Sequence, residues 1–219
     1  MIHDNEIAKQ LAKSLLQIKA IILQPENPFT WAAGWKSPIY CDNRKTLSFP
    51  EIRTYIRQSL ASAVNNQFKG SNIIGGVATA GIPHGVLLAE ELGLPFIYVR
   101  SQAKSHGKQN KIEGYYDRGS SVILIEDLIS SGKSSLEAVN TLRNANLNVK
   151  GVISIFTYGF SQAKENFEND NCKFISLCNY KYILEEALAT NYISKKELPI
   201  LEEWRKKPEL WGKIKNTNI

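Results

Sequence analysis

The chain has 219 residues, of which 43% are hydrophobic and 22% charged, and this ordinary globular composition excludes a largely disordered chain. The formal net charge is +6 at pH 7, with Lys and Arg spread along the chain and denser at 100–118 and 205–215. This pattern favours a small polyanionic ligand over nucleic acid as the partner.

No apolar run approaches the roughly 20 residues of a membrane span, so we expect no membrane partner. The cysteines form no CxxC pair, so no zinc site or disulfide framework is indicated, and a reducing cytoplasm fits best.

The first segment, residues 1–23, has the spacing of an amphipathic helix. Its apolar positions are Ile7, Leu11, Leu15, Ile18 and Ile22. Charged residues recur throughout the segment, which argues against a signal peptide. A segment rich in Pro, Gly and Trp follows at 25–44 and does not fit a βαβ unit. We expect residues 1–48 to form a small N-terminal lobe, called the hood below.

From residue 50 onwards, short β-branched or aromatic runs alternate with helical patterns. Strands are predicted at 72–77, 95–99, 121–125, 151–158 and 172–177, and helices near 50–68, 82–92, 133–146 and 161–169. This alternation predicts one α/β domain, a mostly parallel twisted sheet flanked by helices. Ligands of such sheets bind at the carboxyl ends of the strands. The basic tail at 204–219, with two tryptophans, is predicted to be a docked C-terminal helix.

Residues 100–119 separate two predicted strands but show no periodicity, and they hold three glycines and several basic residues. A loop of this length in a compact domain is usually a functional lid or a disordered segment. We expect a mobile lid beside an anion site. Of the three histidines, only His106, which lies in this segment, is a site candidate.

The most informative stretch is 122–135, with the sequence VILIEDLISSGKSS. An apolar strand is predicted to end in Glu126 and Asp127, and a Ser/Gly turn then opens a helix with good N-cap residues. Backbone N–H groups and hydroxyls at a helix start form a site for a phosphate dianion. The two carboxylates are placed to accept hydrogen bonds from sugar hydroxyls or to help position Mg²⁺. A Walker A loop is excluded, because GxxxxGK[ST] needs glycine at position 127.

This order of strand, acidic pair and turn resembles the phosphoribosyl pyrophosphate (PRPP) motif of the type I phosphoribosyltransferases. The resemblance implies that the acidic pair holds the ribose hydroxyls and that residues 128–134 hold the 5′-phosphate. The loop GGVATAGIP at 75–83 resembles the family's pyrophosphate loop, with alanine where many relatives carry lysine. The residues implied for PRPP binding are Thr79, Ala80, Arg100, Lys104, His106, Glu126, Asp127, Leu128, Ile129, Ser130, Ser131, Gly132, Lys133 and Ser134.

The segment FTWAAGWKSPIYCDNR at 29–44 resembles the N-terminal signature of the orotate phosphoribosyltransferase family. It supplies an aromatic face and cations for a carboxylated base. The resemblance implies that Phe29, Lys36 and Ser130 contact the base. Lys36 and Arg44 are both candidates for the cation that meets the carboxylate of the base.

The segment YVRSQAKSHG at 98–107 resembles the lid of the same family. In that family, Arg, Lys and His of the lid reach the pyrophosphate, usually across a dimer interface. Carried over by position, these residues are Arg100, Lys104 and His106, which join Asp127 as the implied catalytic residues.

The implied reaction is transfer of the 5-phosphoribosyl group from PRPP to orotate, giving orotidine 5′-phosphate and pyrophosphate, in pyrimidine biosynthesis. The resemblance also implies a homodimer with shared sites, and Mg²⁺ that is held through PRPP near Glu126 and Asp127 without a direct protein ligand. Two alternatives stay open. One is a phosphoribosyltransferase for another base, and the other is a PRPP-sensing regulator that binds nucleic acid.

Overall fold

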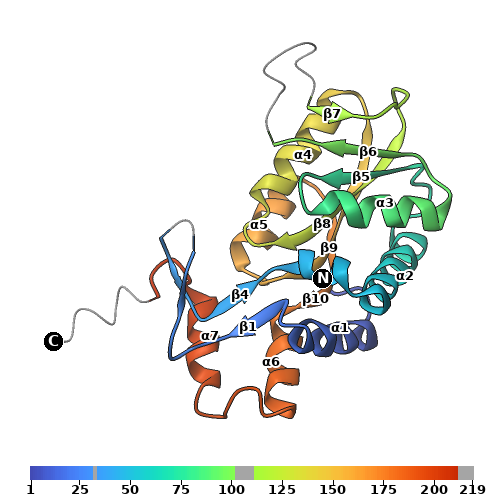
Figure 1. The fold of residues 1–219 in the computed structure, drawn as a ribbon. Coiled ribbons are helices and arrows are strands. Elements are labelled where there is room, and N and C mark those ends of the chain that lie inside the picture. The colour runs from blue at the N-terminus through green and yellow to red at the C-terminus, as the bar shows by residue number, and fades with distance from the viewer. Residues whose placement is uncertain (32–33, 102–110, 212–219) are drawn as a thin grey trace.

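The computed structural model describes residues 1–31, 34–101 and 111–211. Its centre is a six-stranded sheet in the order β10-β9-β8-β5-β6-β7, shown in Figure 1. The strands are β5 (Ile73–Val77), β6 (Phe96–Val99), β7 (Ile112–Glu113), β8 (Ser121–Ile129), β9 (Asn148–Thr157) and β10 (Phe174–Asn179). Neighbouring strands pair in parallel except β7, which is antiparallel to β6. The predicted mostly parallel sheet is confirmed.

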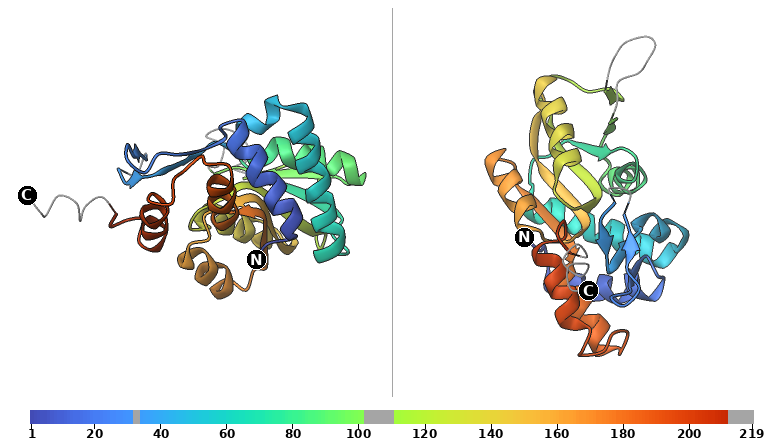
Figure 2. Two further views of the ribbon diagram at one scale, coloured as in Figure 1. Left: turned by 90° about the horizontal axis from the view of Figure 1, so that it is seen from below. Right: turned by 90° about the vertical axis from the view of Figure 1, so that its left-hand side faces the viewer.

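Helices cover both faces of this sheet, as the right-hand view of Figure 2 shows. One face carries α1 (Asn5–Gln17), α2 (Pro50–Gln67), α3 (Gly81–Leu92) and α6 (Tyr180–Ala189), and the other carries α4 (Lys133–Asn144) and α5 (Ser161–Asn169). Successive residues of β8 enter opposite core layers: Ile123 and Ile125 pack in the first, Val122 and Leu124 in the second. A strand buried on both faces needs apolar residues at every position, which explains its continuous apolar run.

Small elements precede this body within residues 1–48. Strand β1 (Ile21–Leu23) pairs antiparallel with β4 (Ile39–Cys41), and β2 (Phe29–Thr30) forms a hairpin with β3 (Lys36–Ser37). A 3-10 helix, η1 (Asn43–Ser48), leads into α2. Trp31 packs its ring 5.4 Å from Tyr158 and 5.7 Å from Trp204 of α7 (Leu198–Lys206). An aromatic cluster therefore ties this lobe to the C-terminal helices.

The predicted N-terminal helix ends earlier than its apolar spacing suggested. Asp4 caps α1 by accepting hydrogen bonds from two first-turn amides, but the helix stops at Gln17. Lys19 then adopts a left-handed conformation with φ of +54°, and Ile22 lies in β1 opposite Tyr40 of β4. The prediction that Ile22 belongs to the helix was wrong. The helical spacing of apolar residues continues past Gln17, but the antiparallel pairing of β1 with β4 holds Ile22 in a strand.

Other boundaries also differ from the prediction by a few residues. Strand β8 continues past the predicted end at residue 125 as far as Ile129, because β9 stays paired with it up to Thr157. Helix α7 ends at Lys206, before Lys207 and Pro208, since a residue followed by proline disfavours helical geometry. Residues 212–219 of the predicted C-terminal helix lie outside the described residues. In the parts of the chain that the structure describes, no helix is long and apolar enough to cross a membrane.

Candidate active site

The carboxyl ends of β5, β6 and β8 open on the same side of the sheet (Figure 1). The loop after β5, the residue that follows β6, and the turn after β8 meet there. A small cavity of about 30 Å³ is lined by Ala78, Arg100 and Ser134, among others. The fold thus brings together three segments that are spread over more than fifty positions of the sequence, from Ala78 to Ser134, as expected for a parallel sheet.

The acidic pair lies inside β8, not after it. Glu126 is only 6% exposed and accepts hydrogen bonds from Ser135 Oγ at 3.2 Å and from the backbone N–H of Asp127 at 3.1 Å. Burial, reinforced by the adjacent Asp127 carboxylate, raises the pKa of Glu126 well above its ordinary value. Burial also raises the pKa of Asp127, while hydrogen bonding and the Arg44 guanidinium oppose that rise. Because two buried charges so close repel each other, the pair holds a proton more readily than isolated carboxyl groups do.

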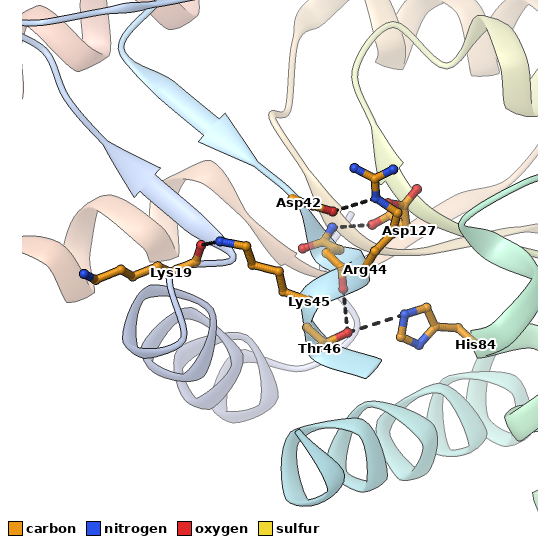
Figure 3. A network of polar contacts seen from close by, with 8 residues as sticks. Lys19, Asp42, Arg44, Lys45, Thr46, His84 and Asp127 are labelled. Atoms are coloured by element: carbon orange, nitrogen blue, oxygen red, sulfur yellow. Dashed lines mark hydrogen bonds and ion pairs between the residues drawn. The ribbon is translucent and has the colours of Figure 1, made fainter. Parts of the chain in front are cut away.

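Two residues of helix η1 lie close to Asp127 (Figure 3). Asn43 donates from Nδ2 to the backbone carbonyl of Asp127 at 2.8 Å. Arg44 forms an ion pair with Asp42 at 2.7 Å between Nε and Oδ1, and its guanidinium lies beside the Asp127 side chain (Figure 3). Arg44 was a candidate from its sequence motif, but Asn43 was not, because no sequence spacing connects it to a residue 84 positions away.

A buried histidine lies behind this helix. Thr46 donates its hydroxyl to the carbonyl of Asn43 at 2.6 Å, and its Oγ1 is 3.5 Å from Nε2 of His84 on α3. Because His84 is only 1% exposed, burial lowers its pKa to about 4. The imidazole is therefore neutral at physiological pH, and it contacts η1 through Thr46.

The turn between β8 and α4 borders a cavity of about 370 Å³. It is lined by Leu128, Ile129, Ser130, Ser131, Gly132, Lys133, Ser134, Ser135 and Glu137. The N-cap is Gly132 in the left-handed conformation, with φ of +79°, and no side chain caps the helix. The expectation of a side-chain N-cap was wrong, because this backbone geometry suits glycine and directs no hydroxyl at the first amides. These amides remain for an anion at the positive end of the helix.

The loop after β5 packs directly against the acidic pair. A Cβ on Gly81 would collide with the carbonyl oxygen of Ile125, next to Glu126. Only glycine permits this approach. Helix α3 begins here with Ala80 as its N-cap and again without a side-chain cap, and Thr79 is exposed. A second set of helix-start amides therefore lies close to the first.

Comparison with known proteins identifies this architecture. Residues 47–187 match the phosphoribosyl transferase domain. The chain is 50% identical over 206 residues to the orotate phosphoribosyltransferase of Porphyromonas gingivalis, covering 94% of this chain and 98% of that protein. It is also 50% identical over 207 residues to that of Listeria innocua, covering 94% and 99% respectively. The chain belongs to the orotate phosphoribosyltransferase family.

Solved structures of phosphoribosyltransferases share this fold. The orotate phosphoribosyltransferase of Aeropyrum pernix superimposes with a TM-score of 0.73 at 26% identity, covering 84% of this chain and 99% of that one. The UMP synthase of Leishmania donovani gives a TM-score of 0.77 at 26% identity, covering 90% of this chain and 42% of that one. The expected type I phosphoribosyltransferase fold is confirmed.

The basic residues expected in a phosphoribosyltransferase lid are described only in part. Arg100 follows β6, donates its backbone N–H to the carbonyl of Lys111 at 2.8 Å, and forms an ion pair with Glu113 at 3.4 Å. Lys104 and His106 lie outside the described residues. Strand β7 falls within the predicted lid and pairs with β6. Movement of the remaining segment stays a prediction.

The hood residues expected to contact the base lie on the β2–β3 hairpin. Phe29 packs with its ring 5.5 Å from that of Tyr40, and Lys36 donates from Nζ to Thr30 Oγ1 at 2.9 Å. Of the two cations considered for the base carboxylate, Arg44 is the one beside the acidic pair. The role of both hood cations stays a prediction.

The donor atoms of the site suit Mg²⁺ only together with oxygens of a substrate. In residues 1–31, 34–101 and 111–211, no group of three or more His, Cys, Asp or Glu side chains is arranged to hold a metal ion. Glu126 and Asp127 offer two carboxyl groups on β8, directly before the residues that line the 370 Å³ cavity. Magnesium ions commonly bind through one or two carboxylates, several waters and the phosphates of a substrate. This donor set fits an ion that is held chiefly by substrate oxygens.

Proposed function

We propose that this chain transfers the 5-phosphoribosyl group from PRPP to orotate, releasing pyrophosphate and forming orotidine 5′-phosphate in pyrimidine biosynthesis. The observation that carries the proposal is the 370 Å³ cavity at the uncapped start of α4, directly after the acidic pair of buried Glu126 and partly exposed Asp127. This arrangement suits a sugar phosphate, whose hydroxyls meet carboxylates while its phosphate meets amides. The names of the relatives at 50% identity support orotate as the acceptor.

The 5′-phosphate binds in the cavity of residues 128–135 in this proposal, where the hydroxyls of Ser130 and Ser134 add donors to the helix-start amides. Glu126 and Asp127 accept hydrogen bonds from the ribose hydroxyls. Thr79 and Ala80 present backbone amides to the pyrophosphate.

Breaking the bond between the anomeric carbon and pyrophosphate develops positive charge on the ribose and negative charge on the leaving group. Arg100, with Lys104 and His106 carried over from the resemblance, neutralises the leaving group. Electrostatic groups of this kind are worth roughly 2.7–4 kcal/mol each in comparable enzymes. Mg²⁺ bound to the pyrophosphate supplies further positive charge to it. Ser130, Phe29 and a hood cation, Lys36 or Arg44, orient the base.

The decisive test measures the loss of orotate absorbance when purified protein is mixed with orotate, PRPP and Mg²⁺. We expect consumption that stops when a chelator removes the metal and resumes when Mg²⁺ is restored. Uracil and adenine serve as competing acceptors. Consumption of one of these in place of orotate would change the acceptor assignment. No consumption, together with binding of PRPP in a calorimeter, would favour a PRPP-sensing regulator.

We further propose a cytoplasmic homodimer in which the lid of one protomer serves the site of its partner. Mixing inactive Lys104→Ala protein with inactive Asp127→Asn protein tests this arrangement. Mixed dimers should regain up to about a quarter of the wild-type activity, because one of their two sites receives both intact residues. Self-mixed samples of each variant are the controls. Complete inactivity of the mixture, with subunit exchange verified, would show that each chain is self-sufficient.

A further inference from the structure

Three side chains from separate elements bind alternate backbone carbonyls along the end of β8 and the turn after it. Asn43 of η1 donates to the carbonyl of Asp127 at 2.8 Å. Thr157 at the end of β9 donates to that of Ile129 at 2.9 Å. Asn166 of α5 donates from Nδ2 to that of Ser131 at 2.9 Å.

These donors are held firmly by their surroundings. Asn43 is fully buried and Thr157 is 4% exposed. Helix α5 also touches the turn next to Asn166, because the ring of Phe167 lies 2.5 Å from where a Cβ of Gly132 would stand. The end of β8 and the turn are thus held by η1, β9 and α5. None of these three elements lines the 370 Å³ cavity.

We propose that Asn43, Thr157 and Asn166 are positioning residues for the PRPP turn, and this inference rests on the proposed function. Each peptide unit carries an acceptor that repels phosphate and a donor that attracts it. A carbonyl bound to a protein donor is directed at that donor and not at the anion. Fixing alternate carbonyls therefore pre-organises the amides of this segment before PRPP arrives, which lowers the ordering cost of binding.

Asn166 of α5 provides the sharpest test, because the chain offers a matched control, Asn140, on the neighbouring helix α4. Asn166 and Asn140 both line a polar groove of about 460 Å³ between α4 and α5. Asn140, however, donates to the side chain of Asp170 at 3.3 Å and not to the turn. Replacing either asparagine by aspartate adds the same charge to the same groove, but only Asn166→Asp removes a donor from Ser131.

Steady-state kinetics of Asn166→Asp and Asn140→Asp should separate the two roles. We expect Asn166→Asp to raise the KM for PRPP by about 5- to 10-fold, the effect of one lost hydrogen bond. The KM for orotate and the melting temperature should stay close to wild type. Asn140→Asp should leave both KM values within about twofold. The dissociation constant of PRPP, measured by calorimetry, should change in parallel with its KM.

The pair Asn166→Ala and Asn140→Ala repeats the comparison without added charge, and it replaces the aspartate pair if Asn166→Asp fails to fold. Thr157→Val should raise the KM for PRPP in the same way, and Thr157→Ser, which keeps the hydroxyl, should restore it. Equal KM values for PRPP in the Asn166 and Asn140 variants, with active wild-type protein, would overturn this inference. Inactive wild-type protein would instead overturn the proposed function.

Discussion

At the scale of single residues, Glu126 and Asp127 have different surroundings although they are adjacent in the chain. Glu126 is buried and hydrogen-bonded to Ser135, whereas Asp127 is partly exposed and lies beside Arg44. Burial raises the pKa of both carboxyl groups, well above the ordinary value for Glu126 and less for Asp127, where hydrogen bonds and the Arg44 guanidinium oppose the rise. We therefore propose separate tasks for the two groups, in which Asp127 carries the charge and Glu126 contributes a neutral hydrogen-bonding group.

Replacing Asp127 by Asn should thus cost far more activity than replacing Glu126 by Gln. We expect Asp127→Asn to lower kcat/KM by about 10²- to 10³-fold, because a charge that stabilises the positive ribose is removed. Glu126→Gln resembles the protonated acid and should stay within about 10-fold of wild type. Initial rates of orotate consumption measure both variants, with circular dichroism to verify folding. Equal losses in the two variants would contradict this division of roles.

The buried histidine predicts how stability changes with pH. Its pKa is lowered to about 4 by burial, below the ordinary value of about 6.5. Between these values the unfolded chain binds a proton that the folded chain does not, so stability decreases as the pH falls through this window.

From pH 7.5 to pH 5, His84 should therefore cost the wild type about 2 kcal/mol of unfolding free energy. The His84→Gln variant lacks this titrating group. Its unfolding free energy should therefore fall by about 2 kcal/mol less than that of the wild type over the same pH range. Urea unfolding at the two pH values measures the difference. Parallel pH dependence in both proteins would show that His84 is not held neutral in the fold.

At the scale of elements, the junction of β8, the turn and α4 depends on close contact with α5. Gly132 has a left-handed backbone, and the ring of Phe167 occupies the space where a side chain would begin. The turn cannot move towards α5 unless α5 moves away from α4. The geometry of the cavity proposed for the phosphate is therefore set by helix packing as much as by the residues that line it.

Gly132→Ala should consequently destabilise the protein by about 2–4 kcal/mol, since backbone strain adds to displacement of the Phe167 ring. It should also raise the KM for PRPP. Gly119→Ala is the matched control, because Gly119 has a similar φ of +84° but open space around it. This control should cost about 1 kcal/mol from strain alone. Thermal or urea unfolding measures both, and similar losses would show that the contact with Phe167 is unimportant.

At the scale of the whole molecule, the N-terminal lobe and the C-terminal helices are joined through Trp204. This side chain is fully buried, and its ring lies 5.5–5.7 Å from those of Tyr180, Tyr158, Phe160 and Trp31. The cluster combines residues of α6 and α7 with residues that directly follow β2 and β9. It holds the hood hairpin against the body on the side where the base is proposed to bind.

Trp204→Ala should destabilise the protein by about 3–5 kcal/mol, because a large cavity opens among the surrounding rings. Trp204→Phe keeps an aromatic ring and should lose clearly less. Urea unfolding measures both variants. Loss of the hood hairpin alone, detected as proteolysis within residues 25–40 of otherwise folded Trp204→Ala protein, would place the main role of Trp204 in docking the lobe. Unchanged stability would contradict its role as the centre of the cluster.

Much of the body and its site was predictable from local patterns. Doubly buried strands read as continuous apolar runs, so β5, β6, β8, β9 and β10 were found near their observed positions. The acidic pair and the Ser/Gly turn were recognisable because their chemistry is concentrated in one short segment. The division into hood and lid, the dimer and the binding roles of individual residues stay predictions.

The sequence by itself determined the α/β class, the order of the main strands and the segment that carries the acidic pair, since each depends on neighbours within a few residues. Only the tertiary structure decided where β1 replaces a helix and how far β8 extends, because strand pairing joins residues far apart in the chain. It also decided that Asn43 and Asn166 hold carbonyls 84 and 35 positions away. Such contacts depend on packing across elements, and no local spacing encodes them.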